Sequence, residues 1–206
     1  MPTFTTTWFS KKTESAWENI VPMVKPRRIL EVGSFEGASA TYFIRRYGGV
    51  HALELHCVDS WEGGAEHALI DMTAVEQLFD ANLAEAMAAS PNAVHFVKHK
   101  GRSDQKLAQL IARGRANYFD LAYIDGSHQA PDVLFDALAA FRLVRPGGLL
   151  IFDDYLWTGA SQSEGQAIDL LSCPKPAIDA FTNLYRQKIN LIPAPLFQLF
   201  VAKTSD

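Results

Sequence analysis

Three carboxylates stand at the ends of two apolar segments that the sequence pattern predicts to be strands. Asp125 follows residues 119–124, and Asp153 and Asp154 follow residues 149–152. If these strands are parallel neighbours, they lie about 5 Å apart and the acids crowd one rim of the sheet. A divalent cation would relieve the repulsion between the carboxylates, and Mg²⁺ prefers oxygen ligands. The pattern favours a Mg²⁺ site at the three acids over the alternative, a helix cap beside a solvated acid.

Histidine and tryptophan side chains accompany these acids. His128 lies just past Asp125, where an imidazole could accept a proton near neutral pH. The alternative is a histidine that orients Asp125 or caps the following helix. His67 follows the second predicted strand, and a surface position is favoured for it over the rim of a pocket. Trp157 either lines an acceptor site or fills the core.

A second group of residues lies at a turn from strand to helix. The predicted strand 28–32 ends at Gly33, and Gly37 opens a helix. Free backbone N–H groups are therefore expected at the helix N-terminus, where they could bind a nucleotide-like ligand. Asp59 ends the next predicted strand, where a carboxylate could accept both ribose hydroxyls. A plain strand-to-helix turn is the alternative.

This turn departs from the dinucleotide fingerprint Gly-x-Gly-x-x-Gly. Phe35 occupies the position of the second glycine, which normally lets the backbone approach a pyrophosphate. The bulk of Phe35 and the charges of Glu31 and Glu36 disfavour a diphosphate and favour a ligand with positive charge. A nicotinamide-dependent oxidoreductase is therefore the weaker alternative.

Strands and helices alternate along the chain, which predicts a parallel sheet with helices on both faces. Ligands bind such sheets at the carboxyl ends of the strands. We expect an α/β fold with a doubly wound, seven-stranded, mostly parallel sheet and a C-terminal antiparallel hairpin. The predicted strands are 28–32, 53–58, 93–98, 119–124, 149–152, 188–192 and 196–202, and the predicted helices are 13–24, 38–47, 71–89, 103–111, 131–144, 165–171 and 176–187.

Composition bounds the class of protein. The 206 residues carry a net charge of -4 and no basic run, so nucleic-acid binding has little support. The length predicts one domain, in which residues 1–24 form an arm and a first helix of the same domain as residues 25–206. No segment resembles a signal peptide or reaches the length of a membrane span. Cys57 and Cys173 lack disulfide or metal-site spacing, which favours a cytoplasmic location.

The segment Glu31-Val-Gly33-Ser-Phe-Glu-Gly37, followed by Cys57-Val-Asp59-Ser-Trp61, resembles motifs I and II of class I S-adenosylmethionine-dependent methyltransferases. The sulfonium of that cofactor is cationic and carries no phosphate, which suits an acidic turn. The resemblance implies a cofactor site with Glu31, Gly33, Ser34 and Gly37 at the methionine portion, Asp59 at the ribose, and Trp61 and Ser103 at the adenine. The alternatives are that Trp61 anchors its loop in the core and that Ser103 caps a helix.

The run Asp125-Gly-Ser-His128, with Asp153-Asp154 after Pro-Gly-Gly, resembles the metal-dependent O-methyltransferases. It is most similar to the bacterial group that modifies sugars and other natural products. The resemblance implies that Asp125, Asp153 and Asp154 bind the metal, which holds the hydroxyls of the substrate near the methyl donor. Positions 130 and 131 depart from the aromatic-acid pair that is usual in that family.

The expected protein is an S-adenosylmethionine (SAM)-dependent methyltransferase, with divalent-metal-assisted transfer to a hydroxyl of a sugar or other small molecule. His128 and Asp125 are the expected catalytic residues. Metal-free binding of the cofactor is an open alternative, and an RNA methyltransferase is disfavoured by the negative charge. The acceptor cannot be read from the pattern. The aromatic arm could mediate a homodimer.

Overall fold

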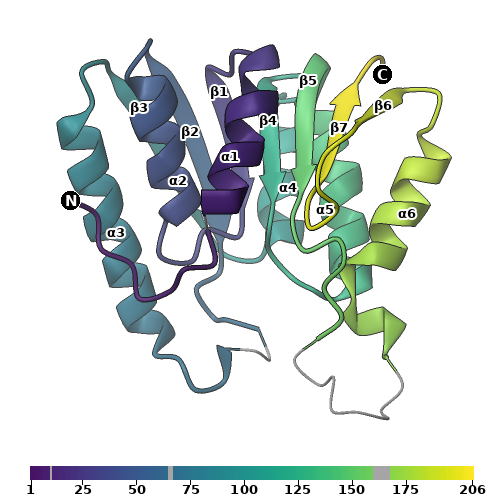
Figure 1. Cartoon of the computed structure of the whole chain (residues 1–206), viewed down its shortest axis with the longest axis horizontal. Helices are drawn as coiled ribbons and strands as arrows, with labels where there is room; N and C mark the ends of the chain where they lie inside the picture. The colour runs from purple at the N-terminus through teal and green to yellow at the C-terminus, as the bar shows by residue number, and fades with distance from the viewer. Residues whose placement is uncertain (10, 65–66, 160–167) are drawn as a thin grey trace.

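The computed structural model describes residues 1–9, 11–64, 67–159 and 168–206. A seven-stranded sheet runs through this part of the chain in the order β3-β2-β1-β4-β5-β7-β6 (Figure 1). Strands β1 to β5 are parallel, and β7 is antiparallel to both β5 and β6. The predicted fold class is confirmed. The strands span Arg28–Val32 (β1), Leu53–Asp59 (β2), Val94–Lys100 (β3), Phe119–Ile124 (β4), Val144–Phe152 (β5), Ile189–Ile192 (β6) and Leu199–Lys203 (β7).

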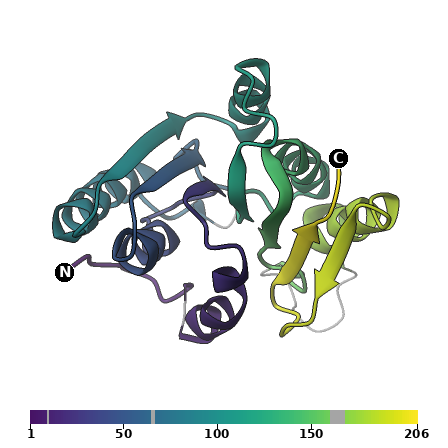
Figure 2. The same ribbon diagram turned by 90° about the horizontal axis from the view of Figure 1, so that it is seen from above.

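Helices cover both faces of the sheet (Figure 2). Two clusters of buried side chains show the arrangement: α1, α2 and α3 pack on one face, and α4, α5 and α6 pack on the other. The helices span Lys11–Ile20 (α1), Ala38–Phe43 (α2), Met72–Ala89 (α3), Ser103–Ala112 (α4), Ala130–Leu143 (α5) and Pro174–Leu184 (α6), with 3₁₀ turns at Val21–Met23 (η1) and Leu170–Ser172 (η4) and a π-helical turn at Ile44–Gly48 (η2).

The alternation of side chains along each strand builds these two cores. In β1, Leu30 and Val32 join the cluster beneath α5, whereas Ile29 joins the cluster beneath α1 and α2. Successive strand residues point to opposite faces, so a strand covered on both sides reads as a continuous apolar run. For this reason the central strands can be predicted from the sequence, although apolar and polar residues do not alternate along them.

The parallel strands all end at one edge of the sheet, the lower edge in Figure 1. Strands β1 and β4 are neighbours at the centre, and the Asp125 N–H donates to the Val32 carbonyl at 2.8 Å. The Asp153 N–H donates to the Ile124 carbonyl at 2.9 Å, which joins the ends of β4 and β5 in the same way. The fold therefore brings the loops after β1, β4 and β5 to one place.

Several element boundaries differ from the prediction. The helix predicted over 38–47 is α-helical only to Phe43 and continues as the π-helical turn η2. Strand β5 begins at Val144, because the Pro-Gly-Gly segment stays in the sheet as an irregularity opposite β4. The predicted cap of α4 at Ser103 or Asp104 is wrong, since Arg102 occupies the N-cap without a side-chain bond. The helix predicted over 165–171 begins on residues 165–167, which lie outside the described part of the chain, and its described remainder holds only the start of the 3₁₀ turn Leu170–Ser172.

Neither Cys57 nor Cys173 forms a disulfide, and both thiols are buried. Among the described residues, no helix combines the length and the apolar character that crossing a bilayer requires. The aromatic N-terminal arm packs on its own chain, where Phe9 contacts Trp17 of α1 with ring centroids 5.0 Å apart.

Lys203 ties the C-terminal hairpin to the end of α5. Its buried ammonium donates to the carbonyl oxygens of Phe141 at 2.9 Å and Val144 at 2.8 Å, and to the side chain of Asn117 at 2.8 Å. The Asp206 carboxylate lies 2.6 Å away and balances the charge. A buried ammonium is tolerated only when it is paired and hydrogen bonded in this way.

Replacing Lys203 by methionine is expected to lower the free energy of unfolding by about 2–4 kcal/mol. The carbonyl oxygens at the end of α5 would lose their donor while remaining buried. Urea denaturation followed by circular dichroism measures the change. Lys25→Met, at an exposed lysine, is the control and should change stability by less than about 0.5 kcal/mol. Equal stability of the two variants would contradict the assigned role of Lys203.

A histidine pair joins β2 to β3 on the face that α4 covers. His56 Nδ1 lies 2.9 Å from His99 Nε2, and His56 Nε2 lies 2.8 Å from Glu54 Oε1. Burial, together with the neighbouring His56, lowers the pKa of His99 from 6.5 to about 4. Burial also lowers the pKa of His56, against the opposing effect of Glu54. The folded protein therefore keeps both imidazoles neutral at pH values at which an exposed histidine would be protonated.

This pair should make the fold sensitive to acid. The unfolded chain binds protons at a higher pH than folded His99 does, so stability falls as the pH drops from about 6.5 toward about 4. When the pH is lowered from about 7.5 to about 5, the free energy of unfolding of His99→Gln is expected to fall by roughly 1 kcal/mol less than that of the wild type, a figure reduced for the partial exposure of the ring. Urea titrations at both pH values test this, with His51→Gln as the control. Identical pH dependence in wild type and His99→Gln would rule it out.

Candidate active site

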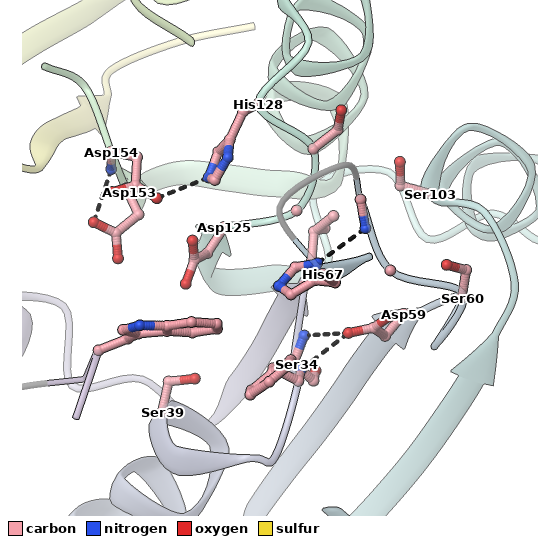
Figure 3. A pocket seen from close by; sticks show the side chains of 18 of the residues that line it. Ser34, Ser39, Asp59, Ser60, His67, Ser103, Asp125, His128, Asp153 and Asp154 are labelled. Atoms are coloured by element: carbon pink, nitrogen blue, oxygen red, sulfur yellow. Dashed lines mark hydrogen bonds and ion pairs between the residues drawn. The ribbon is translucent and has the colours of Figure 1, made fainter. Parts of the chain in front are cut away.

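A cavity of about 910 Å³ opens at the carboxyl edge of the sheet. Figure 3 shows Asp125, His128, Asp153 and Asp154 on one side of it and Asp59, Ser60 and Ser103 on the other. The structure brings together most of the predicted site residues: the cavity is lined by Gly33, Ser34, Asp59, Ser103, Asp125, His128, Asp153 and Asp154. The other predicted cofactor residues, Glu31, Gly37 and Trp61, do not line it.

The turn between β1 and α2, residues 33–37, is called the glycine turn below. Asp59 holds two of its backbone N–H groups, because Oδ2 accepts from Ser34 at 2.8 Å and from Phe35 at 2.9 Å. Asp59 Oδ1 accepts from the N–H of Trp61, in the loop after β2, at 2.7 Å. The Gly37 N–H donates to the Ser34 carbonyl at 2.7 Å. The turn therefore uses these N–H groups to hold its own shape, whereas the expectation of free N–H groups concerns the first residues of α2, which follow Gly37.

Glu31 lies fully buried beneath the glycine turn. Its two carboxylate oxygens accept hydrogen bonds from the hydroxyls of Ser34 and Ser39, each at 2.5 Å. Burial raises the pKa of Glu31, and the two hydroxyls oppose that rise. Both serines line the cavity whereas Glu31 does not. Glu31 therefore acts on the cavity by positioning two hydroxyl groups.

The two glycines of the turn are required by packing. Gly33 has a φ of +83°, and a Cβ there would lie 1.8 Å from the carbonyl oxygen of Asp125. Gly37 has a φ of +81°, and a Cβ there would lie 2.7 Å from the Leu83 side chain in α3. Only glycine combines a positive φ with such close approach. Gly33 thus seats the turn against the end of β4, and Gly37 seats it against α3.

Trp61 anchors its loop in the core, as the alternative reading of the sequence proposed. It is only 5% exposed, and its indole N–H donates to the Phe35 carbonyl at 3.0 Å. Its ring packs on Phe79 with centroids 4.8 Å apart, and the Lys98 ammonium lies 4.4 Å from its centroid. Trp61 therefore stabilises the glycine turn from behind.

Ser103 begins α4 and lines the cavity on the same side as Asp59 (Figure 3). Ser60, directly after β2, lines the cavity between them. His67 also lines the cavity, which corrects the preference for a plain surface position. Its Nδ1 accepts from the Gly64 N–H at 2.9 Å, and its ring stacks on Phe35 with centroids 5.4 Å apart.

On the opposite side, Asp125, Asp153 and Asp154 form the acid rim. The Tyr123 hydroxyl lies between two of these acids, 2.7 Å from Asp125 Oδ2 and in direct contact with Asp153. A hydroxyl has a single proton, so both contacts can be hydrogen bonds only if one carboxyl is protonated. This agrees with the raised pKa of Asp125, which burial and the charges of Asp153 and Asp154 cause, and with the raised pKa of Asp153.

Asp153 has further partners that hold it in place. Gln198 Nε2 donates to Asp153 Oδ2 at 3.0 Å, and the Trp17 indole N–H donates to Gln198 Oε1 at 2.8 Å. The backbone N–H of Asp154 donates to Asp153 Oδ1 at 2.8 Å. Asp153 is therefore the most firmly bonded member of the acid rim.

His128 pairs with the third acid. Its Nε2 lies 2.9 Å from Asp154 Oδ2, and its ring packs on Trp157 with centroids 4.0 Å apart. Trp157 lines the cavity, as one of its two readings proposed. Asp154 adopts a φ of +52°, a backbone conformation that costs energy for a residue with a side chain. In this conformation the Asp154 carboxylate faces His128.

A cation would fit this side of the cavity. Asp125, His128 and Asp154 each offer a ligand atom, and these atoms lie within 4.8 Å of one another. The charges of Asp153 and Asp154 add to burial in raising the pKa of Asp125, and a divalent cation would remove that conflict. The group differs from the predicted Asp125, Asp153 and Asp154 by one member, because Asp153 is turned toward Tyr123 and Gln198.

Sequence reasoning missed several residues that shape the cavity or its rim, among them Tyr123, Gln198, Ser39 and Ser60. Tyr123 had a readable signal, since it lies two residues before Asp125 and strand residues two apart share a face. Gln198 had none, because only the fold of the C-terminal hairpin brings it to Asp153.

Comparison with known proteins identifies the class. A family model described as a methyltransferase domain matches residues 30–155, more than half of the chain. The matched span includes the glycine turn, Asp59, Ser103 and the acid rim. Catechol O-methyltransferase domain-containing protein 1 of Mus musculus is 24% identical over 178 residues, which cover 85% of this chain and 60% of that protein. The chain therefore spans about three fifths of the length of that relative.

Solved structures share the fold. The O-methyltransferase TomG from Streptomyces achromogenes, solved in complex with SAM, has a TM-score of 0.62 and 20% identity, covering 95% of this chain and 81% of that one. The MycE methyltransferase of the mycinamycin biosynthetic pathway, solved with Mg and S-adenosylhomocysteine (SAH), has a TM-score of 0.53 and 21% identity, covering 96% of this chain and 50% of that one.

The family match overturns the alternative of a nicotinamide-dependent oxidoreductase. It agrees with the substitution of Phe35 for the second glycine of the dinucleotide fingerprint. The chain belongs to the methyltransferase domain family.

Proposed function

We propose that the protein transfers a methyl group from SAM to a hydroxyl of a small molecule, such as a sugar or another natural product, with the assistance of a divalent metal. The observation that carries the proposal is the grouping of Asp125, His128 and Asp154 across the cavity from Asp59 (Figure 3). One side of the cavity thus suits a nucleoside donor and the other suits a cation with a hydroxyl acceptor.

The donor side is assigned to the glycine turn and the loops after β2 and β3. The proposed cofactor contacts are Gly33, Ser34, Asp59 and Ser103, which line the cavity together with the unpredicted Ser39 and Ser60. Glu31, Gly37 and Trp61 support this surface from beneath. The glycine turn carries the buried Glu36, lies over the buried Glu31 and has no lysine or arginine, which favours a cationic sulfonium over a phosphate.

The acceptor side is assigned to the acid rim and His128. Asp125 and Asp154 belong both to the predicted metal ligands and to the group that the geometry assembles, so they are the principal proposed ligands, with Asp153 as the third acid. A divalent cation bound there would lower the pKa of an acceptor hydroxyl. MycE, which was solved with Mg and SAH, gives this assignment a precedent within the fold.

His128 is the proposed general base. Asp154 holds its imidazole at 2.9 Å and Trp157 packs on its ring, so the side chain has a defined orientation at the rim. An imidazole accepts a proton efficiently near neutral pH. The walls of the cavity would align the acceptor oxygen with the methyl group and exclude water, and such orientation can supply several kcal/mol of the barrier.

Thermal denaturation with SAH, with and without Mg²⁺, tests both sides of the cavity. SAH alone should raise the Tm of the wild type, and Mg²⁺ should raise it further, because each ligand binds only the folded state. Asp125→Asn should lose the Mg²⁺ increment, keep the SAH increment and show a higher Tm without ligands, because one crowded charge is gone. Asp104→Asn, at an exposed acid of α4, is the control.

The outcomes separate the parts of the proposal. Absence of an SAH increment in the wild type would overturn the assigned donor site. An SAH increment without an Mg²⁺ increment, and methyl transfer that persists in EDTA, would favour the metal-free alternative.

A second experiment tests the role of Asp59. Its carboxylate accepts three backbone N–H bonds, whereas an asparagine amide offers a single oxygen acceptor. Asp59→Asn is therefore expected to weaken SAH binding about tenfold or more in isothermal titration calorimetry. Asp132→Asn, at another acid that lines the cavity, should change the affinity less than about threefold. Unchanged SAH affinity in Asp59→Asn would refute the assignment.

A further inference from the structure

An acid that the proposed function leaves unused lies behind the donor side of the cavity. Asp136 of α5 is only 1% exposed, and neither of its carboxylate oxygens has a hydrogen-bond partner among the described residues. Buried polar groups are almost always satisfied, and leaving one unsatisfied is costly. The explanation for this carboxyl lies in the groups around it.

Asp136 stands at the point where the ends of β1 and β4 meet. A Cβ at Gly126 would lie 3.7 Å from Asp136 Oδ2 and 3.9 Å from the backbone nitrogen of Gly33. Gly33, Gly126 and Ser103 all line the cavity, whereas Asp136 does not. Asp136 therefore lies directly behind the wall that the proposed function assigns to the cofactor.

Ser103 and three charged groups act on the Asp136 carboxyl. Burial raises the pKa of Asp136 from 3.8 to about 7, and the Ser103 side chain at the start of α4 gives the strongest opposition to that rise. The charged groups that face the carboxyl are Asp132 of the same helix, Asp104 of α4 and Arg102 just before α4. Ser103 is thus the neighbour that can satisfy the orphaned carboxyl, which changes protonation close to neutral pH.

A serine hydroxyl has a single proton, so the state of Asp136 decides where the Ser103 proton points. An ionised carboxylate only accepts hydrogen bonds and draws that proton toward itself, which leaves Ser103 as an acceptor on the cavity side. A protonated carboxyl donates to the Ser103 oxygen instead, which frees the serine proton for a ligand. Adenine offers ring nitrogens as acceptors and an amino group as a donor, so the two states recognise different atoms of the base.

We propose that Asp136 is a positioning residue of the donor site, which in its protonated form directs the Ser103 hydroxyl toward a ring nitrogen of the cofactor adenine. The proposal rests on the function proposed above, since it concerns the same donor site. A cofactor seated against Ser103 would shield Asp136 further from water, and shielding favours the neutral carboxyl. The complex therefore keeps this proton at a higher pH than the free protein does, and affinity falls as the pH rises above about 7.

Isothermal titration of SAH at about pH 6 and about pH 8.5, without Mg²⁺, tests the proposal with a probe that lacks the sulfonium charge. The wild type should bind SAH about fivefold to tenfold more weakly at the higher pH. Asp136→Asn stays neutral, so it should match the wild type at about pH 6 and change less than about twofold at about pH 8.5. Asp80→Asn, at an acid of α3 that is 55% exposed and does not line the cavity, is the control and should keep the pH dependence of the wild type.

Proton uptake separates this role from a merely structural one. Titrations at about pH 7.5 in two buffers of different ionisation enthalpy measure the protons that the protein takes up when SAH binds. The wild type should take up more protons than Asp136→Asn. Ser103→Ala, which removes the hydroxyl and keeps the acid, should bind SAH more weakly and take up fewer protons than the wild type.

Equal pH dependence and equal proton uptake in wild type and Asp136→Asn would overturn the role of Asp136 and leave the proposed donor site intact. If circular dichroism shows that Asp136→Asn does not fold, the wild type and Ser103→Ala decide, because equal proton uptake in those two proteins would also overturn the role. A wild type that fails to bind SAH at both pH values would overturn the proposed donor site itself, so the two failures are distinguishable.

Discussion

The close contact between Gly33 and the end of β4 is the constraint on which the site depends. A side chain at position 33 would lie 1.8 Å from the Asp125 carbonyl oxygen, so only glycine lets the turn after β1 rest against that strand end. Because β1 and β4 are neighbours in the parallel sheet, this contact sets the proposed donor turn beside the acid rim. Methyl transfer requires such proximity, since donor and acceptor must be in line.

Hydrogen-bonded acids give the site its shape before any ligand binds. Asp59 holds three backbone N–H groups around the glycine turn, and Glu31 holds two serine hydroxyls beneath it. Glu36 fixes the N-terminal arm to the same turn. The two buried carboxylates, Glu31 and Glu36, are hydrogen bonded in the interior, which is the condition under which a buried polar group is tolerated. The acid rim is the exception, because its charges crowd one another and a cation would stabilise them.

Much of the fold could be predicted because its signals are local. Apolar runs, glycine turns and proline positions marked seven strands and their order along the chain, and the parallel arrangement followed from their alternation with helices. Boundaries were less accurate where tertiary packing overrides local preference. The Pro-Gly-Gly segment, for example, stays in β5 because β4 lies beside it. The acids at the strand ends could be predicted for the same reason as the strands.

By itself, the sequence determined the class of fold and the residues that ring the cavity, since strand ends and glycines are local features. Their individual roles were decided by tertiary structure. Glu31, Gly37 and Trp61 lie in the motifs that resemble those of methyltransferases. They do not line the cavity, however, and instead support the glycine turn from beneath. Asp153 is bonded to Gln198, a residue far along the chain that no spacing rule connects to it. A motif specifies which side chains are near a site, whereas packing decides which of them face it.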